Sequence, residues 1–272
     1  MMVFYSEIIL PETKQICQVR QMTYEDYIIV NRFLQNDVSK HIQQCFIDLL
    51  HKYTNCKDFT GIDMLAALLF LRTISIGGTL KLTLNNTVHQ VDIVGTLQKI
   101  SDLELPKKNH SFGNITLRFQ TPCNLIAPVY TDYIHSISVP DASRTFLLTQ
   151  EERQQICDIL LADILPDISD LAKQIDTTLQ TVKVWIIDRE VAISFEDLSA
   201  FDLLKLIFKD NVVSCQQRLL ALVAGFELDT SYILGLPFAE VELLLSMLKE
   251  RESAREESSK TSGIPLQLPS MM

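Results

Sequence analysis

Glycine is scarce in this sequence, which has eight glycines among 272 residues. Gly77 and Gly78 form their only close pair. Loops that bind phosphate groups need several glycines at fixed spacing, because backbone N–H groups must approach the ligand. The chain contains no Walker A loop, no dinucleotide-binding fingerprint and no Gly-x-Ser-x-Gly elbow. The sequence therefore argues against nucleotide-dependent enzymes and against α/β-hydrolases.

An excess of basic residues is also missing. The 24 lysines and arginines are outnumbered by 34 aspartates and glutamates, so the formal net charge is −10. A protein that binds nucleic acid needs a basic surface to neutralise phosphates. We therefore expect no nucleic acid among the partners of this protein.

Closely spaced cysteine pairs are missing as well. The six cysteines are scattered along the chain, and none belongs to a Cys-x-x-Cys motif. We expect reduced and mostly buried thiols here, without disulfide bonds.

No apolar run is long enough to cross a membrane. The most apolar stretch, FTGIDMLAALLFLRTISIGG at residues 59–78, has only eight uncharged residues between Asp63 and Arg72. A membrane span needs about 20. A helix that is apolar all round and too short for a bilayer belongs to a protein core. Residues 1–14 also lack the basic start and the apolar run of a signal peptide. We expect a core helix, no membrane span, and a soluble protein that works where it is made.

The first half of the chain shows both strand and helix patterns. Thr23 and Thr60 are suited to cap helices, because an acidic residue follows each of them after three positions, and Gly77 is suited to end the second helix. The expected strands are residues 3–10, 16–22, 80–84, 88–94 and 114–121. The expected helices are residues 23–35, 38–53 and 60–77.

The second half is mainly helical. The expected helices are residues 149–164, 167–179, 196–209, 215–226 and 238–258, and the expected hairpin joins residues 182–188 to 191–195. The fold class is therefore α+β, with hairpins and apolar core helices in the N-terminal half and a mainly helical C-terminal half with one small hairpin. A change in composition near Pro140 predicts an α+β domain over 1–140, a mainly helical domain over 141–258 and a flexible tail over 259–272.

The segment from Asp63 to Gly77 resembles a motif of the small baseplate hub proteins of T-even-like contractile-tailed phages. In that family an aspartate opens an apolar helix that ends in Leu-Arg-x-x-Ser-x-Gly, and Leu71, Arg72 and Ser75 stand at the matching positions. The order of the other elements is similar over nearly the whole chain. It includes the helix that starts with YEDY, the strand ITLRFQTP and the leucine-rich, acidic last helix.

The chain departs from the family pattern in two places. Leu65 and Ala66 stand where the family usually has a glutamate and a tyrosine. The hairpin VKVWIIDREVAISF lacks the paired cysteines of many members. The resemblance therefore implies a distant member with no metal at this hairpin.

The resemblance implies a structural component of the baseplate hub and not an enzyme. Its partners would be other baseplate hub and tail proteins, or further copies of itself. It would be made in the host cytoplasm and reside in the tail baseplate of the virion. An alternative stays open: a non-structural chaperone or assembly factor that holds hub parts and then leaves.

Histidine and cysteine offer one candidate pair for a metal. His41 and Cys45 are four residues apart and can share a helical face, but His51 points about 120° away from Cys45. None of the five histidines belongs to a recognisable nucleophile arrangement. We expect no metal site and no cofactor.

Carboxylates cluster at Glu151–Glu152 and at Glu240 and Glu242. A glycosidase would need two opposed carboxylates, one of them with a raised pKa. These residues instead stand at helix starts, where acidic groups interact favourably with the helix dipole. We therefore expect no catalytic residues.

Partner contacts are expected at Arg72 and at the last helix with its tail. Arg72 either stands at the helix end, where it bonds the last carbonyls of its own helix or extends its charged group outward to water, which we favour, or forms an ion pair between subunits. The apolar stripe of the last helix either packs inside the chain or docks in a groove of a partner. The exposed edges of the N-terminal strands are a further candidate. The candidate residues are Arg72, Val241, Leu244, Leu245, Leu248, Ile264, Leu266 and Leu268.

Overall fold

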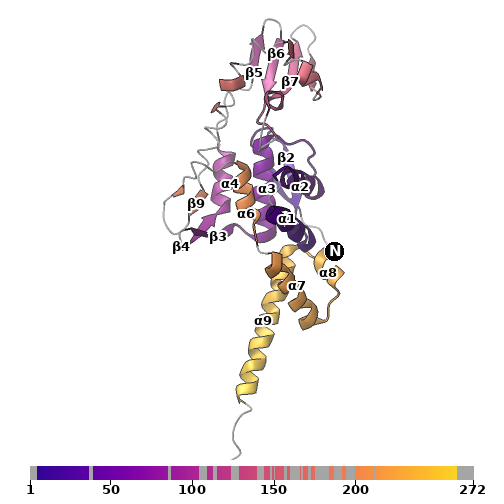
Figure 1. Cartoon of the computed structure of the whole chain (residues 1–272), viewed down its shortest axis with the longest axis vertical. Helices are drawn as coiled ribbons and strands as arrows, with labels where there is room; N and C mark the ends of the chain where they lie inside the picture. The colour runs from indigo at the N-terminus through magenta and orange to yellow at the C-terminus, as the bar shows by residue number, and fades with distance from the viewer. Residues whose placement is uncertain are drawn as a thin grey trace, which may run out of the picture.

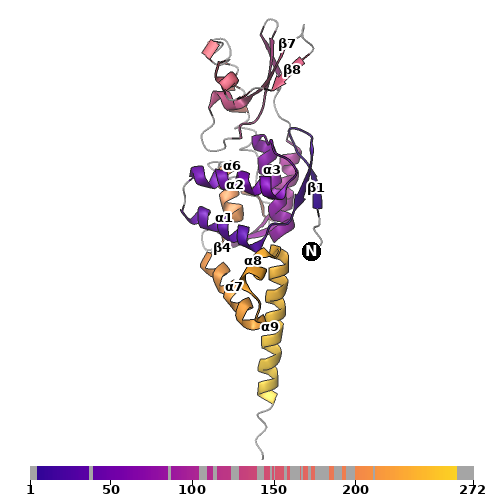
Figure 2. The ribbon, with the colours of Figure 1, turned by 90° about the vertical axis from the view of Figure 1, so that its right-hand side faces the viewer.

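The computed structural model describes residues 5–36, 39–84, 87–103, 109–112, 115–123, 129–139, 144–147, 149, 151–155, 158–159, 166, 168–170, 173–174, 184–186, 192–193, 200–210 and 212–261. The described elements follow one long axis (Figure 1, Figure 2). A four-stranded sheet lies at one end, a helical body in the middle, and one long helix projects from the other end. The fold is α+β, as the sequence predicts.

A β-hairpin and two helices form the start of the chain. They are β1 (Tyr5–Ile9), β2 (Ile16–Arg20), α1 (Tyr24–Asn36) and α2 (Ser39–Tyr53). The strands are antiparallel, and the turn is closed by the N–H of Leu10, which donates to the carbonyl of Gln15 (2.9 Å). The hydroxyl of Thr23 accepts from the N–H of Asp26 (3.4 Å) at the start of α1. The predicted hairpin, cap and helices are confirmed.

The most apolar stretch is helix α3 (Gly61–Ile76), and it lies at the centre of the body (Figure 1). Most of its side chains are buried, and it packs against β2, α2 and α4 (Ile93–Ser101). Thr60 caps its start, and the N–H of Gly77 donates to the carbonyls of Arg72 (3.3 Å) and Thr73 (3.1 Å) at its end. The predicted core helix is confirmed.

The capping interpretation of Asp63 is wrong in one respect. Its carboxylate does not bond back to the start of its own helix but accepts from the N–H groups of Glu12 (2.7 Å) and Thr13 (3.1 Å) in the β1–β2 turn. Glu12 in turn accepts from the N–H of Thr121 (3.1 Å) and from its hydroxyl. Two buried carboxylates therefore join the β1–β2 turn, the start of α3 and the segment that follows β6 (Ile115–Phe119). Burial raises the pKa of Asp63 despite these donors.

An antiparallel four-stranded sheet lies beside α3 and α4. Its order is β10-β9-β4-β3. Its strands are β3 (Thr79–Leu84), β4 (Thr87–Asp92), β9 (Val184–Ile186) and β10 (Ala192–Ile193). Both hairpins are predicted from the sequence, but their pairing through β4 and β9 is not. The predicted strand 88–94 ends early, because Asp92 caps α4 by accepting from the N–H of Gly95 (3.0 Å).

A second antiparallel sheet has the order β5-β6-β7-β8. Beside β6, its strands are β5 (Asn109–Phe112), β7 (Ile134–Val139) and β8 (Arg144–Leu147), and the 3₁₀ turn η1 (Tyr130–Tyr133) precedes β7. Only β6 is predicted from the sequence. The division at residue 140 falls between β7 and β8, which pair with each other. The division into domains stays a prediction.

The C-terminal helices pack onto the body and share its apolar core. They are α6 (Ala200–Phe208), α7 (Val212–Phe226), α8 (Thr230–Gly235) and α9 (Phe238–Thr261). The sequence predicts all of them except α8. Thr149 caps the described helical residues 151–155, while most of residues 156–179 lie outside the described part. The five cysteines that the structure describes are free thiols, and Cys157 lies outside it.

Candidate partner-binding site

Helices α7, α8 and α9 are attached to the start of α1. The N–H of Phe238 donates to the carbonyl of Met22 (3.1 Å), and the N–H of Tyr24 donates to the carbonyl of Leu236 (2.9 Å). The turn between α8 and α9 is therefore held against the turn between β2 and α1. Backbone bonds of this kind fix the place from which α9 projects.

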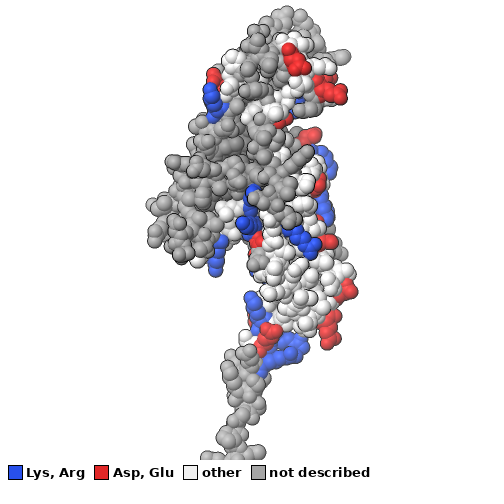
Figure 3. Space-filling model, in the orientation of Figure 1, with Lys and Arg blue, Asp and Glu red and all other residues white. Residues whose placement is uncertain are grey.

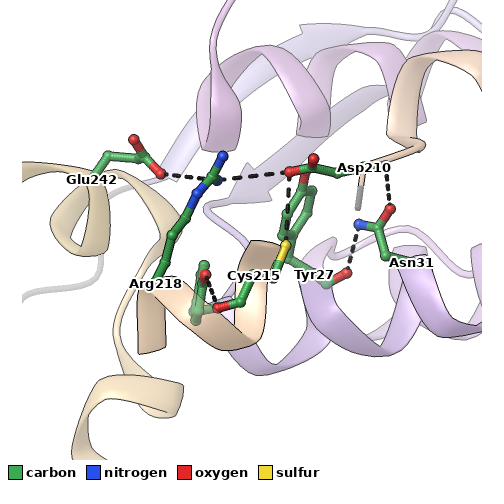
Figure 4. Close-up of polar contacts among 7 residues, drawn as sticks. Tyr27, Asn31, Asp210, Cys215, Arg218 and Glu242 are labelled. Carbon is green, nitrogen blue, oxygen red and sulfur yellow. Dashed lines mark hydrogen bonds and ion pairs between the residues drawn. The ribbon is translucent and has the colours of Figure 1, made fainter. Parts of the chain in front are cut away.

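Asp210, between α6 and α7, is the centre of a polar network that we call the Asp210 clamp (Figure 4). The hydroxyl of Tyr27 donates to its carboxylate (2.8 Å), and Arg218 pairs with the same carboxylate oxygen (3.7 Å). The N–H of Asp210 donates to the side-chain oxygen of Asn31 (2.6 Å). Arg218 also pairs with Glu242 (3.4 Å). The clamp therefore joins α1, α7 and α9.

The surroundings of the clamp shift the pKa values of Tyr27 and Arg218 upward. Burial raises the pKa of Tyr27, and the neighbouring Asp210 carboxylate raises it further. Burial alone would lower the pKa of Arg218, but Asp210 and Glu242 outweigh burial and the pKa is raised. Tyr27 thus remains a neutral donor and Arg218 remains a cation near neutral pH. The hydrogen bond and the ion pairs of these two residues therefore persist at neutral pH and fix the geometry of the clamp.

The inner face of α9 packs against the rest of the chain. Val241, Leu245 and Leu248 are buried in the core, and Leu244 is half-buried against it. A Cβ atom added to Gly225 of α7 would lie 2.3 Å from Cδ1 of Leu248, so the two helices are in close contact there. A partner could reach these side chains only if α9 left α7. Their role in partner binding stays a prediction.

The outer face of α9 carries large apolar side chains that the sequence analysis missed. Leu243 and Met247 are 61% and 49% exposed, and at about 100° per residue they point roughly opposite to Val241. We call the exposed residues that share this face the outer stripe: Ala239, Leu243, Met247, Glu250 and Ala254. Leu243 and Met247 are visible in the sequence as apolar residues that do not fit the predicted stripe.

Helix α9 continues past the end of α7 (Figure 1). Arg251 donates to the carbonyl of Gly225 (3.3 Å), one residue before α7 ends, and α9 runs on to Thr261. The surface over α7 and the first turns of α9 is largely uncharged, and charged side chains gather further along α9 (Figure 3). The projecting helix therefore presents an apolar region followed by a charged one.

Residues 2–201 match a family model described as T4 bacteriophage base plate protein. The chain belongs to this family. No curated protein and no solved structure matches the chain. The matched range of this baseplate protein includes both four-stranded sheets and the helices from α1 to α4. Helices α7 to α9 follow the matched range, and the Asp210 clamp holds them to it.

Arg72 of the baseplate protein is buried at the end of α3. Its guanidinium donates to the carbonyls of Gly77, Thr79 (3.2 Å) and Ile207 (3.5 Å), so it ties α3 to β3 and α6. Of these carbonyls only that of Gly77, the cap residue directly after α3, lies at the helix end, so the expected bonding to the last carbonyls of its own helix is seen there alone. A role for Arg72 in partner binding stays a prediction. The remaining candidates lie outside the residues that the structure describes: Ile264, Leu266 and Leu268.

The His41 and Cys45 pair, which the sequence analysis considers for a metal and rejects, lines a pocket of about 310 Å³ between α1 and α2. His41 and Cys45 lie on one side of it, and Ile29 and Phe33 contribute apolar surface. Within the described ranges, no group of three or more His, Cys, Asp and Glu side chains is close enough to hold a metal ion. His51 instead places its Nε2 atom 2.9 Å from a backbone carbonyl.

Two of the four carboxylates considered for catalysis in the baseplate protein, Glu152 and Glu242, have structural partners. Glu152 accepts from the N–H of Thr149 (2.7 Å) and caps its helix start, which lowers the pKa of Glu152. Glu242 pairs with Arg218 in the Asp210 clamp. Among the described helices, none is both long and apolar enough to cross a lipid bilayer.

Proposed function

We propose that this baseplate protein is a structural component of the baseplate hub and acts through protein–protein contacts during tail assembly. Its membership of the baseplate family supports the role in the baseplate. The resemblance of the segment from Asp63 to Gly77 to hub proteins supports the hub. The protein would be made in the host cytoplasm and retained in the virion, without a catalytic step or a cofactor. Its partners would be other hub and tail proteins.

The outer stripe of α9 is the observation that carries this proposal. Leu243 and Met247 remain exposed on a helix that continues past its neighbour α7. An apolar stripe on one face of a helix is suited to dock into a groove of another protein. Full burial of such a side chain from water is worth about 1.5–3 kcal/mol, and covering the half that each still exposes would contribute part of this to binding.

The negative charge of Glu250 on the outer stripe indicates which charge a partner would carry. Glu250 follows Met247 on the outer stripe and is exposed. A partner that covers the stripe would therefore present apolar side chains first and a lysine or arginine about one turn further on. Such complementarity fixes the register of a contact and excludes wrong partners.

The Asp210 clamp supports the same function. A helix that is already held in its bound orientation loses less conformational entropy when it binds. Tyr27 and Arg218 hold the first half of α9 through contacts with Asp210 and Glu242. In this proposal, Val241, Leu245 and Leu248 position the helix while the outer stripe makes the contact.

A second candidate is a non-structural assembly factor that holds hub parts and then leaves. The charges along residues 249–255 favour it, because these residues are all exposed. Ion pairs between exposed groups are weak and screened by salt. A contact made by this part of α9 would dissociate readily.

Quantitative mass spectrometry of purified phage particles separates the two candidates. A hub component should be present at a fixed low copy number, in a ratio to a tail tube protein that fits the symmetry of the tail. An assembly factor should be abundant in infected-cell lysate and absent from particles. Recovery of the protein only with capsid proteins would overturn both.

A further inference from the structure

The outer edge of β1 is open for another strand. In the described part of the chain β1 pairs only with β2. The backbone of Gln18 bonds Asn55 on the far side of β2, through Gln18 N–H to Asn55 Oδ1 (2.8 Å) and Asn55 N–H to Gln18 O (3.3 Å). Since Gln18 is opposite Glu7, Glu7 must also direct its N–H and C=O away from the hairpin. Tyr5 and Ile9, two positions on either side, do the same.

The face of the hairpin beside this edge is exposed and carries three large apolar side chains around the hydrogen-bonded pair of Glu7 and Gln18. Tyr5, Ile9 and Ile16 are 58%, 63% and 60% exposed, and Ile9 lies directly opposite Ile16. Cys17 and Val19, on the opposite face, are buried in the core. An open strand edge beside exposed apolar side chains is a site for strand addition.

The segment after α9 has the sequence of a strand suited to this edge. Residues 264–269 read IPLQLP, so the three apolar residues alternate with Pro265, Gln267 and Pro269. Ile264, Leu266 and Leu268 carry N–H groups that can all face β1. Pro265 and Pro269, which have no backbone N–H, then face away from β1. Proline is tolerated on an open strand edge, and there it prevents the pairing of a further strand.

The side chains also agree with antiparallel pairing. Directly opposite residues of antiparallel strands place their side chains on the same face. If Ile264, Leu266 and Leu268 pair with the outward-facing residues of β1, their side chains cover the exposed face of Tyr5 and Ile9. The apolar surface of both segments would be buried in one step.

The segment of the same chain cannot reach its own β1. Helix α9 has 24 residues and is therefore about 36 Å long. It starts beside Met22, close to the hairpin, and points away from β1 (Figure 2). Ile264 follows Thr261 by three residues, which span about 10 Å at most. The strand must come from another molecule.

We propose that residues 264–268 of one copy add as an antiparallel strand to β1 of a second copy. Each copy then offers one donor segment and one acceptor edge, so the contact is head-to-tail and builds rings or open chains. The inference goes beyond the proposed function, because it concerns only contacts between copies of this chain.

Two proline variants of the full-length protein test the donor segment. Leu266→Pro removes an N–H that would bond β1, and Gln267→Pro removes one that would face away. Sedimentation velocity over a range of concentrations should show assembly of the wild type and of Gln267→Pro, and only monomers of Leu266→Pro. A monomeric wild type at every concentration, or equal assembly of both variants, would overturn the proposal. With a monomeric wild type, a different protein would be the remaining candidate to bind the open edge of β1.

A third variant tests the acceptor edge. Glu7→Pro removes an outward N–H without breaking the β1–β2 ladder, and its far-UV circular dichroism should match the wild type. It should be monomeric alone. A mixture of Glu7→Pro and Leu266→Pro should form a one-to-one dimer, because one intact edge and one intact segment remain. Two variants that stay monomeric when mixed, despite native spectra, would contradict a head-to-tail contact.

Discussion

The hydroxyl of Tyr27 donates a 2.8 Å hydrogen bond to the carboxylate of Asp210, which lies 183 positions later in the chain. Arg218 of α7 forms an ion pair with the same carboxylate and a second ion pair with Glu242 of α9. The direction of the projecting helix is thus coupled to a tyrosine of α1.

Tyr27→Phe should destabilise the protein by about 1–2 kcal/mol, because it removes one buried hydrogen bond to a charged group. The ring contact with Phe238, at 4.7 Å between centroids, should remain. Urea denaturation measures the free energy of unfolding. Tyr232→Phe is the matched control, since Tyr232 is exposed, and it should leave that free energy unchanged. Equal values for both variants would contradict the role of the clamp.

Asp63 should make stability fall as pH rises. Burial raises the pKa of Asp63 in the folded protein, so the folded state binds this proton more tightly than the unfolded state. The free energy of unfolding therefore falls as the pH rises from the ordinary carboxyl pKa to the raised pKa of Asp63. At higher pH the buried, ionised carboxylate destabilises the folded state by a constant amount.

The variant Asp63→Asn isolates this effect, because asparagine does not titrate. Unfolding free energies of wild type and variant should be compared from about pH 4 to about pH 8. The wild-type value minus the variant value should decrease with rising pH and then level off. A difference that stays constant, or grows, would show that the Asp63 pKa is not raised.

Gly77→Ala should cost about 1–3 kcal/mol of stability, because Gly77 has φ 122° and ψ 162°, a conformation almost restricted to glycine. A Cβ atom at Gly77 would meet no other atom, so the cost would come from the backbone alone. Gly235→Ala is the control: it also has open space, and its φ is not positive. Chemical denaturation of both variants checks the prediction, which fails if Gly77→Ala is as stable as the control.

The double variant Leu243→Glu and Met247→Glu should fold normally and assemble poorly. Both side chains are exposed, so the free energy of unfolding should change by no more than about 0.5 kcal/mol. Loss of two apolar contacts should lower incorporation into tails by about tenfold or more. Incorporation is measured by complementing a phage that lacks the wild-type protein. Val94→Glu, at an exposed site on α4, should incorporate like wild type. Normal incorporation of the double variant would show that the outer stripe makes no contact needed for tail assembly.

Local signals explain which parts of the fold are predictable from the sequence. Thr23, Thr60 and Gly77 mark helix ends through bonds with neighbouring residues, so α1 and α3 are predicted closely. Helix α4 is missed because the alternation of VHQVDIV continues past Asp92, the residue that caps it. The strands β5 and β8 have four residues each, which is too short for a clear alternation, although each pairs with its neighbour in the sequence.

The candidate site is predictable only in part, for a physical reason. The sequence shows that α9 has more apolar residues than one face requires, but the position of α7 decides which face is buried. That position depends on Asp210 and its partners, which come from distant parts of the chain. Arg72 is also predictable only in part, because its bonds to Gly77 and Thr79 are local while its bond to Ile207 depends on the position of α6.

Cryo-electron microscopy of the baseplate can show whether the protein is a structural component of the hub. We expect density for this fold at the tail tip, in the symmetry of the hub, with the face of α9 that carries Leu243 and Met247 covered by a neighbouring chain. Density for the fold with that face open to solvent would contradict the proposed contact. A well-resolved hub without the protein would contradict the claim that it is a structural hub component.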